Sequence, residues 1–240
     1  MNLHTLGLAR GCVEMNLVGD LSSARLRDEL IWLLSEPKVE HTIQRIGELG
    51  IAPSIHPALA ADQETAELVT RADRAVGELH LREEVRFWRL RLICMARGLE
   101  PEQLVSWTER LKLRNTDASV ISGGVVLARK VLERMAGAEM SRPALYELLA
   151  RLPAEGLLLA WAQAGEGRAR EAIELFIKEL RYTSLSISGK DLLELGLRES
   201  PEVGRVLTQV KLLKLEGKVD GRDSEMSAAR QILNKIKGHR

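Results

Sequence analysis

The chain has 240 residues and a formal net charge of +1, with hydrophobic residues at 45% and charged residues at 29%. This mixture is typical of a globular protein that can bury a core, which excludes wholesale disorder. Aromatic residues make up only 3%, and this disfavours a β-sandwich or barrel because strands are enriched in β-branched and aromatic side chains. So small a net charge creates no global field for nucleic acid or an anionic membrane, so a polyanion would need a local patch.

The cysteine content and the apolar runs indicate the compartment. Cys12 and Cys94 alone cannot build a disulfide framework or a zinc site. We expect both thiols to be reduced, in a cytoplasmic protein. No apolar run reaches the roughly 20 residues of a transmembrane helix, and residues 1–10 do not resemble a signal peptide. We therefore expect no membrane partner.

Apolar residues recur with helical spacing from the N-terminal region onward. The first clear helix follows Ser22 or Ser23, either of which can cap it, and ends before Pro37. Arg25 and Glu29 stand one helical turn apart in this segment, so we expect them to form an ion pair. A second helix ends at Gly50. Two prolines between residues 51 and 57 then predict a break in the helical pattern.

The middle of the chain predicts longer helices. One amphipathic helix is expected over residues 81–95, and the next opens at Pro101, where a missing N–H costs little. Residues 117–135 contain several valines and isoleucines that would also suit a strand, and Gly123 and Gly124 each weaken a helix by roughly 1 kcal/mol. We still predict a helix there, because the segment keeps the helical period to its end.

The last part of the chain has shorter, glycine-bounded segments. Residues 188–196 predict one short capped turn of helix, residues 201–216 a longer helix closed by Gly217, and residues 224–237 the last helix. The fold predicted for the chain is an all-α, irregular array of about ten helices, with no repeat of fixed period. Candidate module boundaries near residues 57–62 and 137–142 divide it into residues 1–60, 61–138 and 139–240.

Motifs of catalysis are not found in the sequence. It contains no Walker loop, no Gly-x-Gly-x-x-Gly, no His-Glu-x-x-His, no Gly-x-Ser-x-Gly and no Asp-x-Asp pair. His56 is more simply a loop histidine than a metal ligand. Asp220 and Asp223 precede a helix, where capping is the simpler role. We predict no catalytic residue, no metal site and no cofactor in this chain.

The most informative segment for function is 187–222, where cations surround an apolar pattern. The basic residues predicted to bind a phosphate backbone are Lys190, Arg198, Arg205, Lys211, Lys214, Lys218 and Arg222. Helix N-termini combined with lysine and arginine can form such a site. The alternative is that interleaved acids make this an ordinary solvated face.

The run Leu21-Ser22-x-x-Arg25-Leu26-x-x-Glu29-Leu30 lies near the start of the chain, and a second motif lies in the segment from Ile187 to Lys218. In their order and spacing these motifs resemble the C-terminal part of the class II bacterial tRNA nucleotidyltransferase and poly(A) polymerase family, and the first run looks like the neck of that family. The segment from Ile187 to Lys218 is similar to its tail motif, and the positions that carry this similarity are Gly189, Asp191, Leu192, Gly196, Pro201 and Gly204. The family's usual Pro-Gly-Pro in the tail is replaced by Glu199-Ser200-Pro201.

The resemblance implies a neck, body and tail arrangement. In the family a catalytic head holds the nucleotide and two magnesium ions, the neck supports nucleotide selection, and body and tail hold the tRNA. The chain would then be the RNA-binding and structural portion of an enzyme that adds nucleotides to RNA 3′ ends, by CCA addition, A addition or poly(A) synthesis. We expect the head, with its Mg, upstream of Met1, and we expect this chain to be inactive alone.

The same resemblance implies roles for residues of the neck and a partner for the chain, and a second function stays open beside it. Ser22, Arg25 and Glu29 would be structural residues of the neck, and tRNA or another structured RNA would be the partner. The alternative function is a helical protein–protein interaction module with no RNA role.

Overall fold

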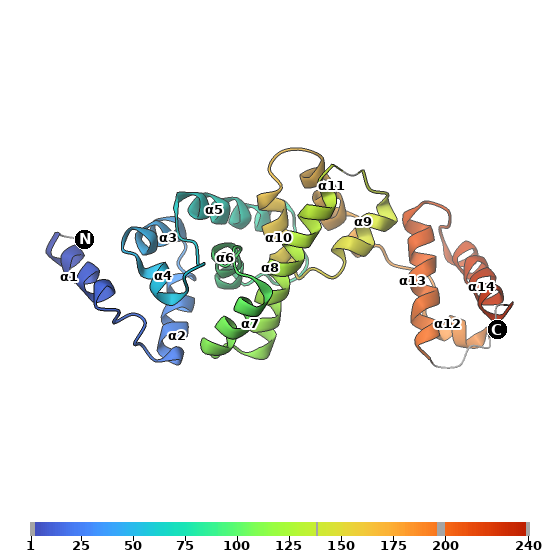
Figure 1. The fold of residues 1–240 in the computed structure, drawn as a ribbon. Coiled ribbons are helices and arrows are strands. Elements are labelled where there is room, and N and C mark those ends of the chain that lie inside the picture. The colour runs from blue at the N-terminus through green and yellow to red at the C-terminus, as the bar shows by residue number, and fades with distance from the viewer. Residues whose placement is uncertain (1–2, 138, 196–199, 239–240) are drawn as a thin grey trace. The chain divides into compact units, whose positions relative to one another are not determined.

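The computed structural model describes residues 3–137, 139–195 and 200–238, and the regular secondary structure in these ranges is helical (Figure 1). Its described residues form 14 α-helices and one short 3-10 helix, with no strand. The all-α prediction is confirmed. Among the described residues, no helix combines the length and the apolar character needed to cross a bilayer.

The chain packs as two compact units. Unit 1 comprises Met1–Ala138 and Arg151–Glu174, and unit 2 comprises Glu139–Ala150 and Leu175–Arg240. The predicted division into neck-like, body and tail segments at residues 60 and 138 is a different kind of division from these packing units, and it stays a prediction.

The helices of unit 1 are α1 (Leu3–Glu14), α2 (Ser23–Leu33), α3 (Val39–Glu48), α4 (Ile51–Ile55), α5 (Gln63–Glu78), α6 (Phe87–Met95), α7 (Pro101–Arg110), α8 (Asn115–Met135) and α10 (Ala154–Gln163). Unit 2 contains α9 (Arg142–Leu149), the 3-10 helix η1 (Leu180–Tyr182), α12 (Gly189–Glu194), α13 (Pro201–Leu215) and α14 (Arg222–Gly238). Helix α11 (Arg168–Lys178) contributes residues to both units.

Helix α6 is the centre of unit 1. It packs against α5, α8 and α10 (Figure 1), and every residue from Leu90 to Met95 is buried. The expected amphipathic helix over 81–95 is therefore wrong in two respects. The helix begins only at Phe87, after Arg86 in an extended conformation. It is buried around most of its circumference, as is usual for a helix surrounded by others.

A buried arginine joins α6 to the end of α2. The Arg91 guanidinium is 4% exposed and donates to both carboxylate oxygens of Asp73 in α5, its Nη2 at 2.8 Å from Oδ2. It also donates to the carbonyl oxygens of Leu34 and Glu36, each at 2.7 Å. Burial raises the pKa of Asp73, whereas the hydrogen bond from Arg91 opposes that shift. A charge this deeply buried is tolerated because its donors are satisfied.

Helix α2 begins as predicted, but its expected ion pair is not formed. The Ser22 hydroxyl accepts a hydrogen bond from the Arg25 backbone N–H at 3.4 Å, so Ser22 is the N-cap. Arg25 and Glu29 are both exposed, and no ion pair joins them in the described structure. Instead, Arg27 pairs with Asp28 at 2.8 Å. The physical reason is that an exposed pair gains too little to hold two long side chains together.

Two further segments differ from the expectations drawn from proline and glycine. Residues 51–55 form the short helix α4 despite Pro53, because a proline in the first turn removes no intrahelical hydrogen bond. Residues 115–135 are one continuous helix, as predicted, and the glycines have a packing role. A Cβ at Gly156 of α10 would lie 2.9 Å from the Gly124 Cα of α8, so the backbones of α8 and α10 approach closely there.

This close approach predicts opposite effects for two glycine substitutions. Gly156→Ala should lower the free energy of unfolding by about 1–3 kcal/mol, because the added methyl group forces the helices apart. Gly123→Ala is the matched control, since a Cβ there meets nothing within 4 Å. It should raise the free energy of unfolding by roughly 0.5–1 kcal/mol through helix propensity. Urea unfolding measures both, and equal effects would contradict the close packing.

Candidate functional site

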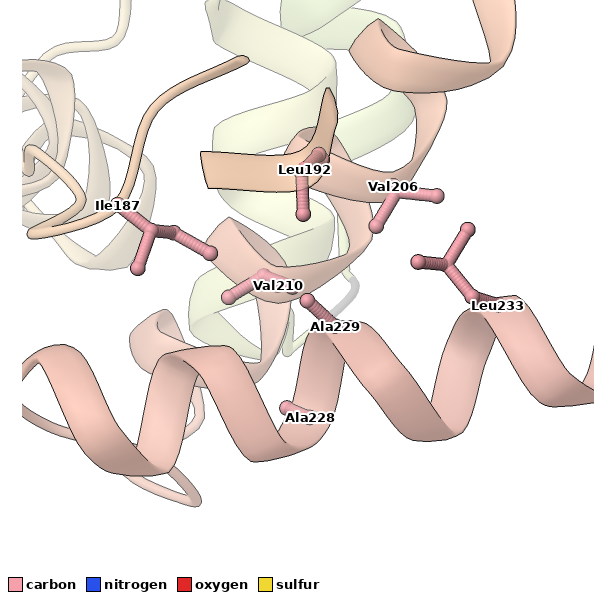
Figure 2. Packing of buried hydrophobic residues seen from close by; sticks show 7 residues of the cluster. All are labelled: Ile187, Leu192, Val206, Val210, Ala228, Ala229 and Leu233. Atoms are coloured by element: carbon pink, nitrogen blue, oxygen red, sulfur yellow. The ribbon is translucent and has the colours of Figure 1, made fainter. Parts of the chain in front are cut away.

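The predicted phosphate-binding segment folds over the apolar core of unit 2. Figure 2 shows Val206 and Val210 of α13 facing Ala229 and Leu233 of α14. The buried cluster consists of Ile187, Leu192, Val206, Val210, Ala228, Ala229 and Leu233. The two alanines place small side chains on the face of α14 that contacts α13, where α13 and α14 pack together. This core gives the surrounding polar groups fixed positions.

Asp191 connects the start of α12 to α14. Its carboxylate accepts hydrogen bonds from the Ser188 backbone N–H at 2.6 Å and from the Ser188 hydroxyl at 2.8 Å, which forms a capping box. It also binds the Arg222 guanidinium. The hydrogen bonds from Ser188, and then Arg222, lower the pKa of Asp191 to about 2. The tail-motif aspartate therefore has a structural role.

Glu225, which sequence reasoning missed, lies at the centre of this arrangement. Its side chain is fully buried at 0% exposure. It accepts hydrogen bonds from the backbone N–H groups of Ser186 (2.7 Å) and Ile187 (3.2 Å) and from Lys214 Nζ (2.8 Å). In the sequence it is one more acid in the first turn of a helix, a common pattern with no sign of burial.

Four of the predicted RNA-binding cations have partners within unit 2. Lys214 binds Glu225, and this hydrogen bond raises the lysine pKa. Lys211 Nζ donates to the Tyr146 hydroxyl at 2.7 Å. Lys218 pairs with Glu216 at 2.6 Å, and Arg222 binds Asp191. Lys211, Lys214 and Arg222 thus hold elements of unit 2 together.

Lys190 and Arg205 differ from the other four. Both are exposed, and neither has an ion pair or side-chain hydrogen bond within the described ranges of the chain. Lys190 lines a hollow formed by the N-terminal ends of α12 and α13, whose other lining residues are Ser188, Gly189, Leu193, Ser200, Val203 and Gly204. Arg205 directly follows Gly204, where a Cβ would meet nothing within 4 Å. An anion that enters the hollow would meet the exposed Lys190, and Arg205 is the next residue after the lining Gly204.

Several tail-motif residues have structural roles in the helices that form this hollow. Pro201 is the first residue of α13, where its missing N–H leaves no bond unmade. Gly189 lies near Val203, since a Cβ on it would be 3.4 Å from that side chain. The predicted positions Gly196 and Arg198 lie outside the described residues.

The described histidine and cysteine side chains that could have carried chemistry give no sign of a reactive or metal-binding site. His56 Nδ1 accepts a hydrogen bond from the Ala58 N–H at 3.1 Å, and burial followed by Arg110 lowers the histidine pKa. Cys12 is exposed, whereas burial raises the pKa of Cys94 to about 12, so its thiolate is not available near neutral pH. Within the described residues, no three histidine, cysteine, aspartate or glutamate side chains gather to hold a metal ion.

Comparisons with known proteins agree with the sequence resemblance. A family model described as the probable RNA and SrmB-binding site of polymerase A matches residues 13–63, from the end of α1 to the start of α5. The A-adding tRNA nucleotidyltransferase of Geobacter sulfurreducens is 27% identical over 237 residues, an alignment that covers 94% of this chain and 27% of that protein.

Solved structures show the same helical fold. A CCA-adding enzyme in complex with CTP matches 98% of this chain and 56% of its own chain with a TM-score of 0.79 and 20% identity. The Thermotoga maritima CCA-adding enzyme complexed with tRNA matches 93% of this chain and 55% of its own, with a TM-score of 0.72 and 19% identity. The chain thus spans about a quarter of the curated relative and just over half of the solved chains. Together these similarities support a region related to the class II tRNA nucleotidyltransferases.

The low pKa of Asp191 predicts an acid-sensitive contribution to the stability of unit 2. A carboxyl whose pKa is lower in the folded chain than the reference value of 3.8 stabilises fully above that value, and the effect is lost as the pH falls through about 2. Asp191→Ala should therefore melt at a lower temperature than the parent at pH 7, and this difference should shrink between pH 4 and pH 2.

Thermal unfolding followed by circular dichroism across that pH range measures the effect. Asp223→Ala serves as the control, since Asp223 is an exposed acid in the first turn of α14, next to Arg222 in the sequence. A difference between Asp191→Ala and the parent that stays constant down to pH 2 would refute the assignment.

Proposed function

We propose that this chain is the RNA-binding and structural portion of a protein that adds nucleotides to the 3′ ends of tRNA or similarly structured RNA. The observation that carries the proposal is a pair of exposed cations without an ion-pair partner among the described residues. Lys190 lines the hollow at the ends of α12 and α13, and Arg205 directly follows Gly204, another of its lining residues. The related A-adding and CCA-adding proteins act on tRNA according to their names, which supports tRNA as the RNA class.

The chemistry of the hollow suits a phosphate backbone. Double-stranded RNA has a deep, narrow major groove that hides base edges, so proteins bind it mostly through shape and through phosphate and 2′-hydroxyl contacts. Such contacts need cations held on a rigid scaffold, and the buried core and the Glu225 hydrogen bonds supply that scaffold. Lys190 and Arg205 would make the direct contacts. The other described cations predicted from the sequence already have partners within unit 2: Lys211, Lys214, Lys218 and Arg222. Arg198, another of the cations predicted from the sequence to bind RNA, lies outside the described residues and stays a proposed contact.

Nucleotide transfer itself we assign to a separate catalytic head, expected upstream of Met1. Phosphoryl-type transfer uses metal ions held on carboxylates. The described residues offer no group of that kind, so magnesium would be bound by the head and supply its chemistry there. The chain covers only 27% of the A-adding relative, which leaves room for such a part in proteins of this kind. A cytoplasmic location is proposed with it.

A protein–protein interaction module remains the second candidate because unit 1 has exposed large apolar side chains. The exposed apolar residues of its first two helices and their connection are Leu8, Met15, Leu17 and Trp32, at 60%, 64%, 45% and 65% exposure. Exposed apolar residues mark an interaction site where they form a contiguous patch. The matched family description names a binding partner besides RNA. Salt separates the two functions, because phosphate contacts weaken steeply with salt and apolar contacts do not.

The RNA-binding proposal predicts the salt dependence of tRNA binding by four variants. Lys190→Ala and Arg205→Ala should each weaken tRNA binding and flatten the log–log salt slope by about one unit, and the double variant by about two. Arg230→Ala removes an equally exposed cation from α14, outside the predicted set, and should bind as the parent does. Fluorescence anisotropy with labelled tRNA at several salt concentrations measures all four.

Two outcomes of the tRNA-binding experiment would contradict the RNA-binding proposal. If the double variant keeps the affinity and the slope of the parent, the hollow at α12 and α13 is a packing feature. If the parent binds tRNA with no salt dependence, or does not bind it, the protein-interaction alternative is favoured.

A further inference from the structure

A second cationic hollow lies in unit 1, where the loop after α7 leads into α8. It encloses about 480 Å³, within the range of sites that hold small ligands. Its charged lining residues are Arg27, Asp28, Arg86, Lys112, Arg114 and Asp117. Four cations face two acids, so the lining carries a net charge of +2. The side chain of Trp88, which is partly buried, also lines the hollow.

The excess positive charge is located at two residues. Arg27 is neutralised by Asp28 and also donates to the Lys112 carbonyl oxygen at 3.0 Å. Arg86 lies 3.7 Å from Asp117, whose carboxylate also accepts from Arg89 at 3.2 Å. Lys112 and Arg114 are exposed and have no acidic partner among the residues that the structure describes. An anion that enters the hollow would meet these two side chains first.

The backbone at Lys112 adopts a conformation that favours glycine. Its φ of +50° lies in the left-handed region, which glycine adopts freely and side-chain-bearing residues adopt at a cost. The turn that ends α7 imposes this conformation: the Lys112 N–H donates to the Glu109 carbonyl at 2.9 Å and the Leu113 N–H to the Thr108 carbonyl at 3.2 Å. A glycine would adopt this helix-ending conformation without that cost.

We propose that this hollow binds the phosphate group of a nucleotide unit, with Lys112 and Arg114 on the phosphate oxygens and Trp88 beside the base. Lysine and arginine are the usual phosphate ligands, and aromatic side chains stack on bases of any sequence. The first turn of the 21-residue helix α8, which starts after Arg114, adds partial positive charge at the same edge. The phosphate can belong to an RNA strand or to a free nucleotide. The RNA source rests on the proposed function and extends it to unit 1.

Lys112→Gly separates binding from stability because its two effects have opposite signs. Glycine relieves the left-handed backbone, so the variant should melt at a higher temperature than the parent. Removing the ammonium group should weaken nucleotide binding and flatten the salt slope of tRNA binding by about one unit. Arg114→Gln should weaken binding in the same way. Lys130→Ala removes an exposed cation toward the other end of α8 and should leave binding unchanged.

The direct readout is the indole N–H signal of Trp88 in nitrogen–proton correlation spectra. The chain has four tryptophans, and Trp88→Phe identifies the signal. Addition of AMP, of inorganic phosphate and of tRNA to separate samples tests the two sources. A shift with AMP that Lys112→Gly weakens supports free-nucleotide binding, and a shift only with tRNA supports the RNA source.

The overturning results are distinct for the two proposals. A Trp88 signal that no probe moves, or a Lys112→Gly variant with the parent's affinities for AMP and tRNA, refutes the hollow in unit 1. Loss of tRNA binding in the Lys190 and Arg205 double variant, with the Trp88 shift by AMP intact, supports both the proposed RNA function and the nucleotide site in unit 1. A parent chain that shifts Trp88 with AMP yet does not bind tRNA refutes the proposed RNA function alone.

Discussion

The buried carboxylate of Glu225 is the constraint on which the arrangement of unit 2 depends. It accepts hydrogen bonds from the backbone before α12 and from Lys214 of α13, while belonging to α14 itself. Removing such a carboxylate would leave two backbone N–H groups and an ammonium without their acceptor, which is costly in a buried place. Lys214 is paired with Glu225, and Arg222 is paired with Asp191. The cations left for a ligand are therefore Lys190 and Arg205, at the edges of the core.

Unit 1 uses the same physical principle with the opposite charge. Arg91 is buried in α6 and satisfies the two carbonyl oxygens after α2 while pairing with Asp73 of α5. Residues 13–63, which match the RNA-binding family model, are thereby fixed to the central helices through the end of α2. In both units buried charges fix the backbone, and the exposed cations proposed to bind phosphate lie near helix ends: Lys190, Arg205, Lys112 and Arg114. This distribution suits recognition of a charged ligand by a rigid surface.

Local signals in the sequence predicted local structure well. Ser22, Pro101 and Ser188 mark helix starts because capping and first-turn chemistry act within four residues. Features that depend on distant partners were missed. Gly124 reads as a helix breaker until Gly156 of α10 is placed against it, and Glu225 reads as a surface acid until the segment before α12 covers it. For the candidate site, the sequence identified the cations of the tail but could not separate those already paired from Lys190 and Arg205, because ion pairing is a tertiary property.

The most direct test of the central claim is hydrogen–deuterium exchange of the whole chain with and without tRNA. The account predicts that tRNA slows exchange of amides near the starts of α12 and α13, around residues 187–195 and 200–207, because bound phosphates cover these helix ends. Protection near residues 110–117 would follow from the second hollow. Slowed exchange confined to residues 8–34, around the exposed Trp32, or no change at any of these segments, would contradict RNA recognition by unit 2.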